Sequence, residues 1–218
     1  GGLVRLGSVA PEVEGAMDFI REASNEVRVS IAHTTADYDT AMAAFGAGAG
    51  HVTHLFNAMP PFTHRAPGVV GAAFDTPDCW VELICDGIHI HPSVVRAVFK
   101  LFGADRVVLV SDTMRAAGMA DGDYSLGGQP VAKKGKYATL ADGTLAGSVT
   151  DLMDCMRTAV SFGIPLADAV RAAAVNPAQS IGIYSRCGSL ENGKWANVVL
   201  LNRDLSIRTV MFKGKIVK

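Results

Sequence analysis

A surplus of positive charge is missing from this sequence. Its 20 lysines and arginines are balanced by 21 aspartates and glutamates, which gives a formal net charge of -1. Proteins that bind nucleic acid usually present a basic face or stripe. The only dense basic cluster here is Lys133, Lys134 and Lys136, which we interpret as a solvated hairpin. We therefore expect no nucleic-acid partner.

Long apolar runs are missing as well. Hydrophobic residues make up 49% of the chain, yet no apolar run approaches the roughly 18 residues that a membrane-spanning helix needs. The start, GGLVRLGSVAPE, also lacks the basic segment and apolar core of a secretory signal. We expect no membrane partner. The composition instead predicts a well-buried globular core.

Cysteine is scarce and follows no regular pattern. The four copies are Cys79, Cys85, Cys155 and Cys187, and none of them forms a CxxC pair. Irregular spacing of this kind is typical of reduced thiols rather than of a disulfide framework. We therefore expect a cytoplasmic location.

Apolar strands alternate with amphipathic helices along most of the chain. The expected strands are residues 3–9, 27–32, 51–56, 80–85 and 106–110. The expected helices are residues 12–24, 37–46, 93–102, 149–162 and 166–174. Repeated strand–helix units predict an α/β fold with a parallel sheet.

Two later segments depart from this alternation. Gly-Gly and Asp-Gly turns between alternating residues predict a hairpin insertion at about 123–143. From Gly188 onward the pattern is entirely that of β-strands and turns. We expect a main domain at residues 1–187 and a small terminal sheet at residues 188–218.

Polar side chains gather where the predicted strands end. The strand ends carry His33, His54, Asp86, His89 and Asp112. In parallel α/β folds the chemistry lies at the carboxyl ends of the strands. We therefore expect these side chains to share one edge of the sheet.

His33 and His54 are separated by one strand–helix unit, so neighbouring strands would bring both imidazoles to one cation. Two histidines on neighbouring strand ends, with an aspartate on a later one, are typical of a metal-dependent hydrolase. Asp112 would then act as general base and general acid. The alternatives are structural: each histidine could hydrogen-bond the backbone, and Asp112 could cap a helix.

The segment HVTHLFNAMPPFTHRAPG, at residues 51–68, combines three histidines with a double proline and an arginine. Arg65 lies beyond the rigid double proline, and arginine is suited to bind phosphate or carboxylate through two hydrogen bonds. A solvated loop arginine is the alternative. We expect His51 and His91 to be structural or surface residues.

These residues lie in longer stretches that resemble the N-acetylglucosamine-6-phosphate deacetylase family of the amidohydrolase superfamily. The stretches are SIAHTTADYD, HVTHLFNAMPPFTHRAPGVVGAAF, CDGIHIHP, VLVSDTMRAAGM, DGTLAGS, AVNPAQSIG and GSLENGKWANVVLL. They extend over essentially the whole chain, and THLFNAMPPFTHRAPG is the most specific of them.

The resemblance implies a (β/α)8 TIM barrel of amidohydrolase type, with a small β-sandwich built from both chain ends. It implies that a divalent metal ion assists hydrolysis of the acetamide of N-acetylglucosamine 6-phosphate to glucosamine 6-phosphate and acetate. Zinc is the expected metal, and iron, manganese or cobalt would also suit the ligands. The implied partners are a small amino-sugar phosphate and, in the full-length protein, a second copy in a homodimer.

The resemblance also implies roles for individual residues. They are His33 and His54 as metal ligands, Asp112 as catalytic acid and base, His89, Arg65, Asn57 and Ala58 as substrate-binding residues, and Leu145 in a loop that closes over the substrate.

One part of the family's pattern is missing. The family has a glutamate metal ligand in a His-Leu-Glu-Gly-Pro segment, which this sequence lacks. Its early acids are expected on or beside a helix; they are Glu12, Glu14, Glu22 and Glu26. The resemblance thus implies an incomplete barrel with the later strands only, and the C-terminal part of the sandwich. Two other functions stay open: another amidohydrolase, similar to a dihydroorotase or a deaminase, and a non-catalytic fragment that binds the sugar phosphate.

Overall fold

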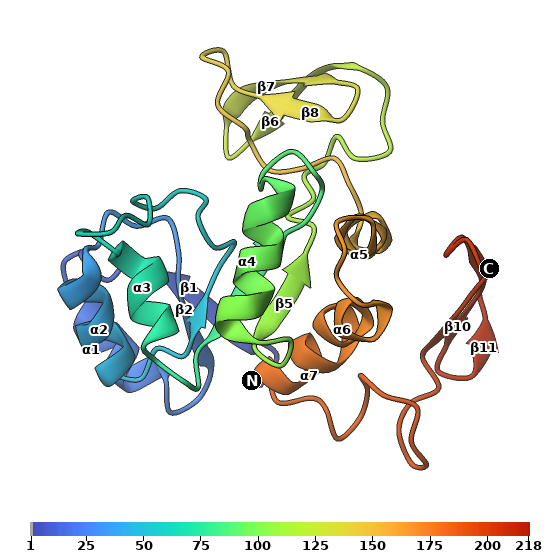
Figure 1. The fold of residues 1–218 in the computed structure, drawn as a ribbon, viewed down its shortest axis with the longest axis horizontal. Helices are drawn as coiled ribbons and strands as arrows, with labels where there is room; N and C mark the ends of the chain where they lie inside the picture. The colour runs from blue at the N-terminus through green and yellow to red at the C-terminus, as the bar shows by residue number, and fades with distance from the viewer. Residues whose placement is uncertain (1) are drawn as a thin grey trace.

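The computed structural model describes residues 2–218 and contains a five-stranded parallel sheet (Figure 1). Its strands are β1 (Leu6–Val9), β2 (Arg28–Ile31), β3 (His51–Val52), β4 (Trp80–Ile84) and β5 (Val107–Val110). The strands lie in chain order, and each pairs in parallel with the next. This confirms the α/β class, and the arrangement is consistent with part of a TIM barrel.

Helices connect the successive strands. They are α1 (Ala16–Ala23), α2 (Tyr38–Gly46), α3 (Gly68–Phe74) and α4 (Pro92–Phe102). One core joins the sheet to these helices, and it includes the fully buried Ile20, Ile31 and Leu83. Burying a side chain of this size stabilises the fold by about 1.5–3 kcal/mol, so this layer is the main source of stability.

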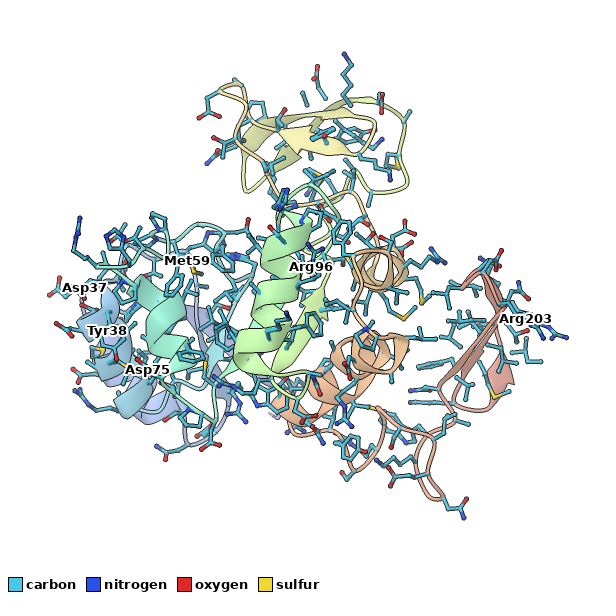
Figure 2. The ribbon with its side chains drawn as sticks, viewed as in Figure 1. Asp37, Tyr38, Met59, Asp75, Arg96 and Arg203 are labelled. Atoms are coloured by element: carbon cyan, nitrogen blue, oxygen red, sulfur yellow. The ribbon has the colours of Figure 1, made fainter. Side chains whose placement is uncertain are left out.

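A polar contact links α2 to α3 at the surface. Figure 2 shows Tyr38 and Asp75 close together, and Tyr38 Oη donates a hydrogen bond to Asp75 Oδ2 at 2.9 Å. Asp37, just before α2, caps that helix by accepting a hydrogen bond from the Thr40 backbone N–H at 2.9 Å. The helix expected from residue 37 therefore begins one residue later.

The first helix begins later than expected. The periodic pattern predicted a helix over residues 12–24, but α1 starts at Ala16. Gly15 precedes it with a left-handed φ of 78°, which interrupts the helical path. As a consequence Glu12 lies in the loop after β1 instead of on the helix.

The third strand is much shorter than expected. A strand was predicted over residues 51–56, but β3 ends at Val52. His54 and Phe56 have positive φ angles of 32° and 74°, which turn the chain out of the sheet. Non-glycine residues rarely adopt this conformation, so the sequence pattern gave no sign of the turn.

A second sheet replaces the single hairpin expected at about 123–143. Its antiparallel strands are β6 (Gly122–Leu126), β7 (Gln129–Lys134) and β8 (Tyr137–Thr139). Figure 1 shows this sheet standing apart from the five-stranded sheet, beyond one end of α4. Val131 and Ala138 are buried in a small core of its own. The solvated interpretation is wrong for Lys133, whose side chain is 10% exposed and pairs with Asp121 at 3.0 Å.

The helices after this sheet cover β5. They are α5 (Leu152–Ser161), α6 (Leu166–Val170), the π-helical turn η1 (Arg171–Val175) and α7 (Asn176–Ser180). The single helix expected at residues 166–174 therefore continues, in three segments, to Ser180. Asn176 is buried, and its Nδ2 donates to the carbonyls of Ala104 and Val107 at 2.7 and 2.6 Å. These bonds hold α7 against β5.

The chain ends in a small antiparallel sheet, as predicted. Its strands are β9 (Val198–Leu201), β10 (Ile207–Phe212) and β11 (Lys215–Ile216). Figure 1 shows the sheet at the edge of the molecule, beyond α5 and α6. Among the helices within residues 2–218, none combines the length and the apolar character needed to cross a bilayer.

Candidate functional site

Two histidine side chains meet at the carboxyl end of the five-stranded sheet. His33 follows β2 and His54 follows β3, and their Nε2 atoms lie 2.9 Å apart. The two rings are nearly perpendicular, with an interplanar angle of 83°. Both residues have left-handed φ angles, 45° for His33 and 32° for His54. The predicted pair is therefore brought together by two matching turns on neighbouring strands.

The chemistry of this pair fits two ligand positions around one divalent ion. Two nitrogens at about 2.0–2.1 Å from one zinc ion lie about 2.9 Å apart at an N–Zn–N angle of about 90°, and about 3.4 Å apart at a tetrahedral angle. His54 is buried, and its Nδ1 has no hydrogen-bond partner within residues 2–218. Burial, and then the neighbouring His33, lower the pKa of His54. The ring is thus kept neutral, which is the form that binds a metal.

A third ligand does not join the two histidines. Within residues 2–218, no group of three or more histidine, cysteine, aspartate or glutamate side chains is arranged to hold a metal ion. The described residues therefore bring two imidazole side chains, and no third candidate ligand, to this place.

Asp112 follows β5 on the same edge of the sheet. Its φ angle is 49°. The Asp112 charge acts on two neighbours: it partly offsets the burial that lowers the pKa of His54, and it adds to the burial that raises the pKa of Glu82. The next helix along the chain begins only at Leu152, so the helix-cap alternative for Asp112 is wrong. The carboxyl group is left free to act on a neighbour.

The loop before α5 contacts the backbone of Asp112. The Ser148 backbone N–H donates to the Asp112 carbonyl at 2.8 Å. Gly147, with a φ of 63°, lies so close that a Cβ atom there would be 3.2 Å from the same carbonyl oxygen. Leu145 lies two residues earlier, half-buried, and forms an isolated bridge with Thr139 of β8. The predicted substrate-closing loop therefore connects the second sheet to Asp112.

His89 is held in a fixed orientation after β4. Its Nδ1 lies 2.7 Å from Asp86 Oδ2, and Asp86 Oδ1 accepts from the Ile88 and His89 backbone N–H groups at 2.9 Å each. Burial opposes the ionisation of Asp86, but the hydrogen bonds from His89 and Ile88 outweigh it and lower its pKa. The carboxylate therefore fixes the ring through Nδ1, and Nε2 is the nitrogen that Asp86 does not engage.

The loop after His54 carries the other predicted substrate residues. Asn57 donates through Nδ2 to the carbonyls of His54 and Leu55 at 3.2 and 3.3 Å. The Ala58 carbonyl accepts from the Thr34 backbone N–H at 3.0 Å. Asn57 and Ala58 thus lie directly beside the histidine pair. Arg65 lies farther along, on the exposed part of this loop.

The two histidines set aside as structural have structural contacts. His51 is 1% exposed, and its Nδ1 hydrogen-bonds Ser30 Oγ at 3.1 Å inside the sheet. Burial lowers the pKa of His51 to about 3. His91 caps α4, where its Nδ1 accepts from the Ser93 backbone N–H at 3.2 Å.

Two acidic residues near the site escaped the sequence interpretation. Glu82, on β4, accepts a hydrogen bond from the His54 backbone N–H at 3.3 Å, and burial raises its pKa to about 7. Glu12, after β1, accepts a hydrogen bond from the Thr35 backbone N–H at 2.5 Å. A signal existed for Glu82, since it is the lone carboxylate in the apolar strand WVELI. No comparable signal marked Glu12, because its partners lie on another strand end.

Comparisons with known proteins agree on one family. The profile of the amidohydrolase family matches residues 6–217. The chain is 39% identical over 218 residues to N-acetylglucosamine-6-phosphate deacetylase of Bacillus subtilis, an alignment that covers 99% of this chain and 55% of the relative. It is 38% identical to N-acetylgalactosamine-6-phosphate deacetylase of Escherichia coli O157:H7, with 98% of this chain and 57% of the relative covered.

A solved structure gives the same likeness in three dimensions. It is a mutant of N-acetyl-D-glucosamine-6-phosphate deacetylase from Mycobacterium smegmatis, in complex with N-acetyl-D-glucosamine-6-phosphate. The TM-score is 0.95 at 38% identity, and the match covers 99% of this chain and 58% of that chain. The chain therefore spans little more than half the length of the proteins it matches.

Proposed function

Because the chain belongs to the amidohydrolase family, whose members generally depend on a divalent metal ion, we propose that its strand-end residues form part of a deacetylase site. The reaction is hydrolysis of the acetamide of N-acetylglucosamine 6-phosphate to glucosamine 6-phosphate and acetate. The observation that carries this proposal is the 2.9 Å approach of His33 Nε2 to His54 Nε2, on the edge of the sheet that also carries Asp112.

His33 and His54 would hold the metal ion. Zinc is the ion we propose, and iron, manganese or cobalt suit the same ligands. A divalent ion there would polarise the amide carbonyl and make a nearby water easier to deprotonate. The neutral state that burial imposes on His54 supports this role, since a protonated imidazole cannot bind a metal.

Asp112 is the proposed acid and base. Its carboxylate would take a proton from the attacking water and return it to the nitrogen of the leaving amine. Each proton removed is thus given back within one turnover, and the carboxylate ends the cycle ionised. The hydrogen bond from the Ser148 N–H to the Asp112 carbonyl supports this role, because it fixes the backbone that carries the acid.

The sugar phosphate would be bound by the loops around the pair. We propose that His89 accepts a hydrogen bond from a sugar hydroxyl through Nε2, since its Nδ1–H is donated to Asp86. Asn57, Ala58 and Arg65 would meet the phosphate, and Leu145 would close over the sugar. The exposed position of Arg65 leaves its guanidinium free for a phosphate or for the partner in a dimer.

A second substrate deserves the same test. N-acetylgalactosamine 6-phosphate differs from the glucosamine compound only in the orientation of one ring hydroxyl. The relative from Escherichia coli O157:H7 that is named for this sugar is 38% identical to the chain, against 39% for the Bacillus subtilis relative. The identities alone do not separate the two sugars.

The remaining proposals concern the whole protein. We propose a division into a partial barrel at residues 1–187 and a part of a small β-sandwich at residues 188–218. The apolar faces of β9 and β10, with Leu200 half-exposed and Phe212 55% exposed, support a sandwich because they are suited to pack against further strands. A homodimer of the full-length protein and a cytoplasmic location stay predictions.

The test is acetate release from both sugar phosphates by the zinc-supplied chain. Asp112→Asn should reduce turnover by about 10²-fold or more and leave zinc binding unchanged. Arg65→Ala should raise KM for the phosphorylated sugar far more than for unphosphorylated N-acetylglucosamine, and equal effects on both would refute the phosphate assignment. A chain that binds the sugar phosphate but releases no acetate would refute the deacetylase proposal and favour the non-catalytic binding fragment.

A further inference from the structure

The two histidine turns are held in an unfavourable backbone conformation. His33 and His54 both have left-handed φ angles, which cost free energy for any residue with a side chain. Such conformations persist only where surrounding contacts hold them in place. The turns are joined to each other by the hydrogen bond from Thr34 N–H to the Ala58 carbonyl. That bond cannot by itself fix both turns relative to the sheet.

Glu12 holds the first turn from one side. Its Oε2 accepts from Thr34 Oγ1 at 2.5 Å, and its Oε1 accepts from the Thr35 backbone N–H at 2.5 Å and from Thr35 Oγ1 at 3.1 Å. Thr34 and Thr35 directly follow His33 in the chain. Both carboxylate oxygens therefore bind the segment that leaves the first histidine.

Glu82 holds the second turn from the opposite side. Its Oε2 accepts from the His54 backbone N–H at 3.3 Å, and its own backbone carbonyl accepts from Leu55 N–H at 2.8 Å. The side chain is 15% exposed, so little water competes for that oxygen. The contact is made to the histidine itself, at the point where the chain leaves β3.

The two contacts are symmetric in the sheet. The strand order is β1-β2-β3-β4, with the histidine turns after the inner pair β2 and β3. Glu12 comes from the loop after β1 and Glu82 comes from β4, so each carboxylate reaches inward from the outer neighbour of a histidine strand. From this arrangement we infer that Glu12 and Glu82 are positioning residues, which fix the two turns so that the His33 and His54 Nε2 atoms converge.

The two carboxyl groups use different numbers of oxygens. Glu12 accepts three hydrogen bonds through both of its oxygens. Glu82 accepts its bond from the His54 N–H through Oε2 alone. Glutamine can reproduce one acceptor oxygen but not two. Glu12→Gln should therefore break its contact, whereas Glu82→Gln should keep it and Glu82→Ala should lose it.

The first readout needs no metal. In the metal-free chain, amide hydrogen exchange reports the Thr35 and His54 N–H groups, whose acceptors are the two glutamates. We expect exchange of Thr35 to become at least about 10-fold faster in Glu12→Gln, and that of His54 in Glu82→Ala. Glu82→Gln and Glu14→Gln, the latter an exposed residue of the same loop as Glu12, should match the wild type. The amides of β5 serve as the reference for global unfolding.

The second readout is the affinity for Zn2+ alone, measured by calorimetry. Groups that orient metal ligands typically change metal affinity by about 10–100-fold, and we expect this loss in Glu12→Gln and Glu82→Ala but not in Glu82→Gln. This part rests on the proposed function, whereas the exchange measurement does not. A wild-type chain that binds no zinc would refute the proposed metal site and leave the exchange result to decide on the turns.

Three results would overturn the inference. Unchanged exchange of Thr35 in Glu12→Gln would show that Glu12 does not hold its turn. Faster exchange in the variants with undiminished zinc affinity would show that the turns do not position the ligands. Equal losses in Glu14→Gln would attribute the effect to charge. If exchange of the β5 amides also becomes faster in Glu82→Ala, that variant is globally destabilised, and the Glu12→Gln result alone then tests the inference.

Discussion

The strands β5 and β9 have almost the same sequence and opposite environments. β5 reads VVLV and β9 reads VVLL. In β5, Val107, Val108 and Leu109 are at most 3% exposed, whereas in β9 Val199 and Leu200 are 48% and 50% exposed. The two strand sequences are therefore almost equally apolar. Their exposure differs because other elements of the fold cover β5 far more fully than β9.

The source of that cover is visible in the fold. β5 contacts α4, α5, η1 and α7, which together close over its outer face. Within residues 2–218, the terminal segment adds Leu201 of β9 and Leu205 of the following turn to the partly buried apolar side chains packed against the main core. Stability and site geometry should accordingly depend on the five-stranded sheet, and hardly at all on the terminal sheet. Matched substitutions in the two regions can test this contrast.

The largest effect should come from the same truncation made in both strands. Leu109→Ala removes a buried side chain in β5 and leaves a cavity, so it should lower the free energy of unfolding by about 2–5 kcal/mol. Leu200→Ala, at a half-exposed position in β9, should lower it by less than about 1 kcal/mol. Urea denaturation followed by circular dichroism measures both. Equal losses would mean that the terminal sheet is covered in solution.

The next effect is a pH dependence that arises inside the five-stranded sheet. Burial raises the pKa of Glu82 from its usual 4.5 to about 7, so between these values the folded chain binds one more proton than the unfolded chain. The Glu82 contribution to stability is then fully present below about pH 4.5 and is lost as the pH rises to about 7. The loss is on the order of 3 kcal/mol, since one pKa unit corresponds to about 1.4 kcal/mol.

His51 changes stability in the opposite direction, so the two must be separated. Burial lowers its pKa to about 3, and its contribution is lost as the pH falls from about 6.5 to 3. The difference between Glu82→Gln and wild type isolates Glu82. In the metal-free chain, the variant should gain stability relative to wild type as the pH rises from 4.5 to 7. A difference that stays constant with pH would contradict the buried, protonated state of Glu82.

A smaller effect should follow from two asparagines. Asn176→Ala removes two buried hydrogen bonds to the carbonyls of Ala104 and Val107, so unfolding should become easier by about 2 kcal/mol. Asn202 makes a similar side-chain bond to Ser206 Oγ at 2.8 Å, but at an exposed site of the terminal sheet. Asn202→Ala should change stability by less than about 0.5 kcal/mol. Thermal unfolding measures both variants. Equal losses of stability would contradict the proposed contrast between the five-stranded sheet and the terminal sheet.

The sequence predicted the main elements of the site for a simple physical reason. The carboxyl ends of parallel strands share one edge, so the strand-end positions of His33, His54 and Asp112 were enough to predict that all three lie on that edge. The turns that orient the His33 and His54 rings could not be predicted from the sequence. Their positive φ angles are stabilised by contacts from other strands, which a local pattern does not show. For the same reason, Glu12 and Glu82 were missed.

Burial was harder to predict than strand position. The VVLV and VVLL strands give the same local signal, and only the helices packed on β5 separate them. The start of α1 and the end of β3 were wrong by several residues, because Gly15 and His54 turn the chain in ways that side-chain periodicity does not record. Sequence periodicity thus fails to predict the conformation and burial of residues that depend on contacts with distant parts of the chain.

The central claim is that His33 and His54 form one metal site on the edge of the five-stranded sheet. Calorimetric titration of the metal-free chain with Zn2+ tests this most directly, with His54→Ala and His91→Ala measured in parallel. The account predicts that the wild type and His91→Ala bind about one ion per chain and that His54→Ala binds none at this site. Zinc binding that is absent from the wild type, or unchanged in His54→Ala, would contradict it.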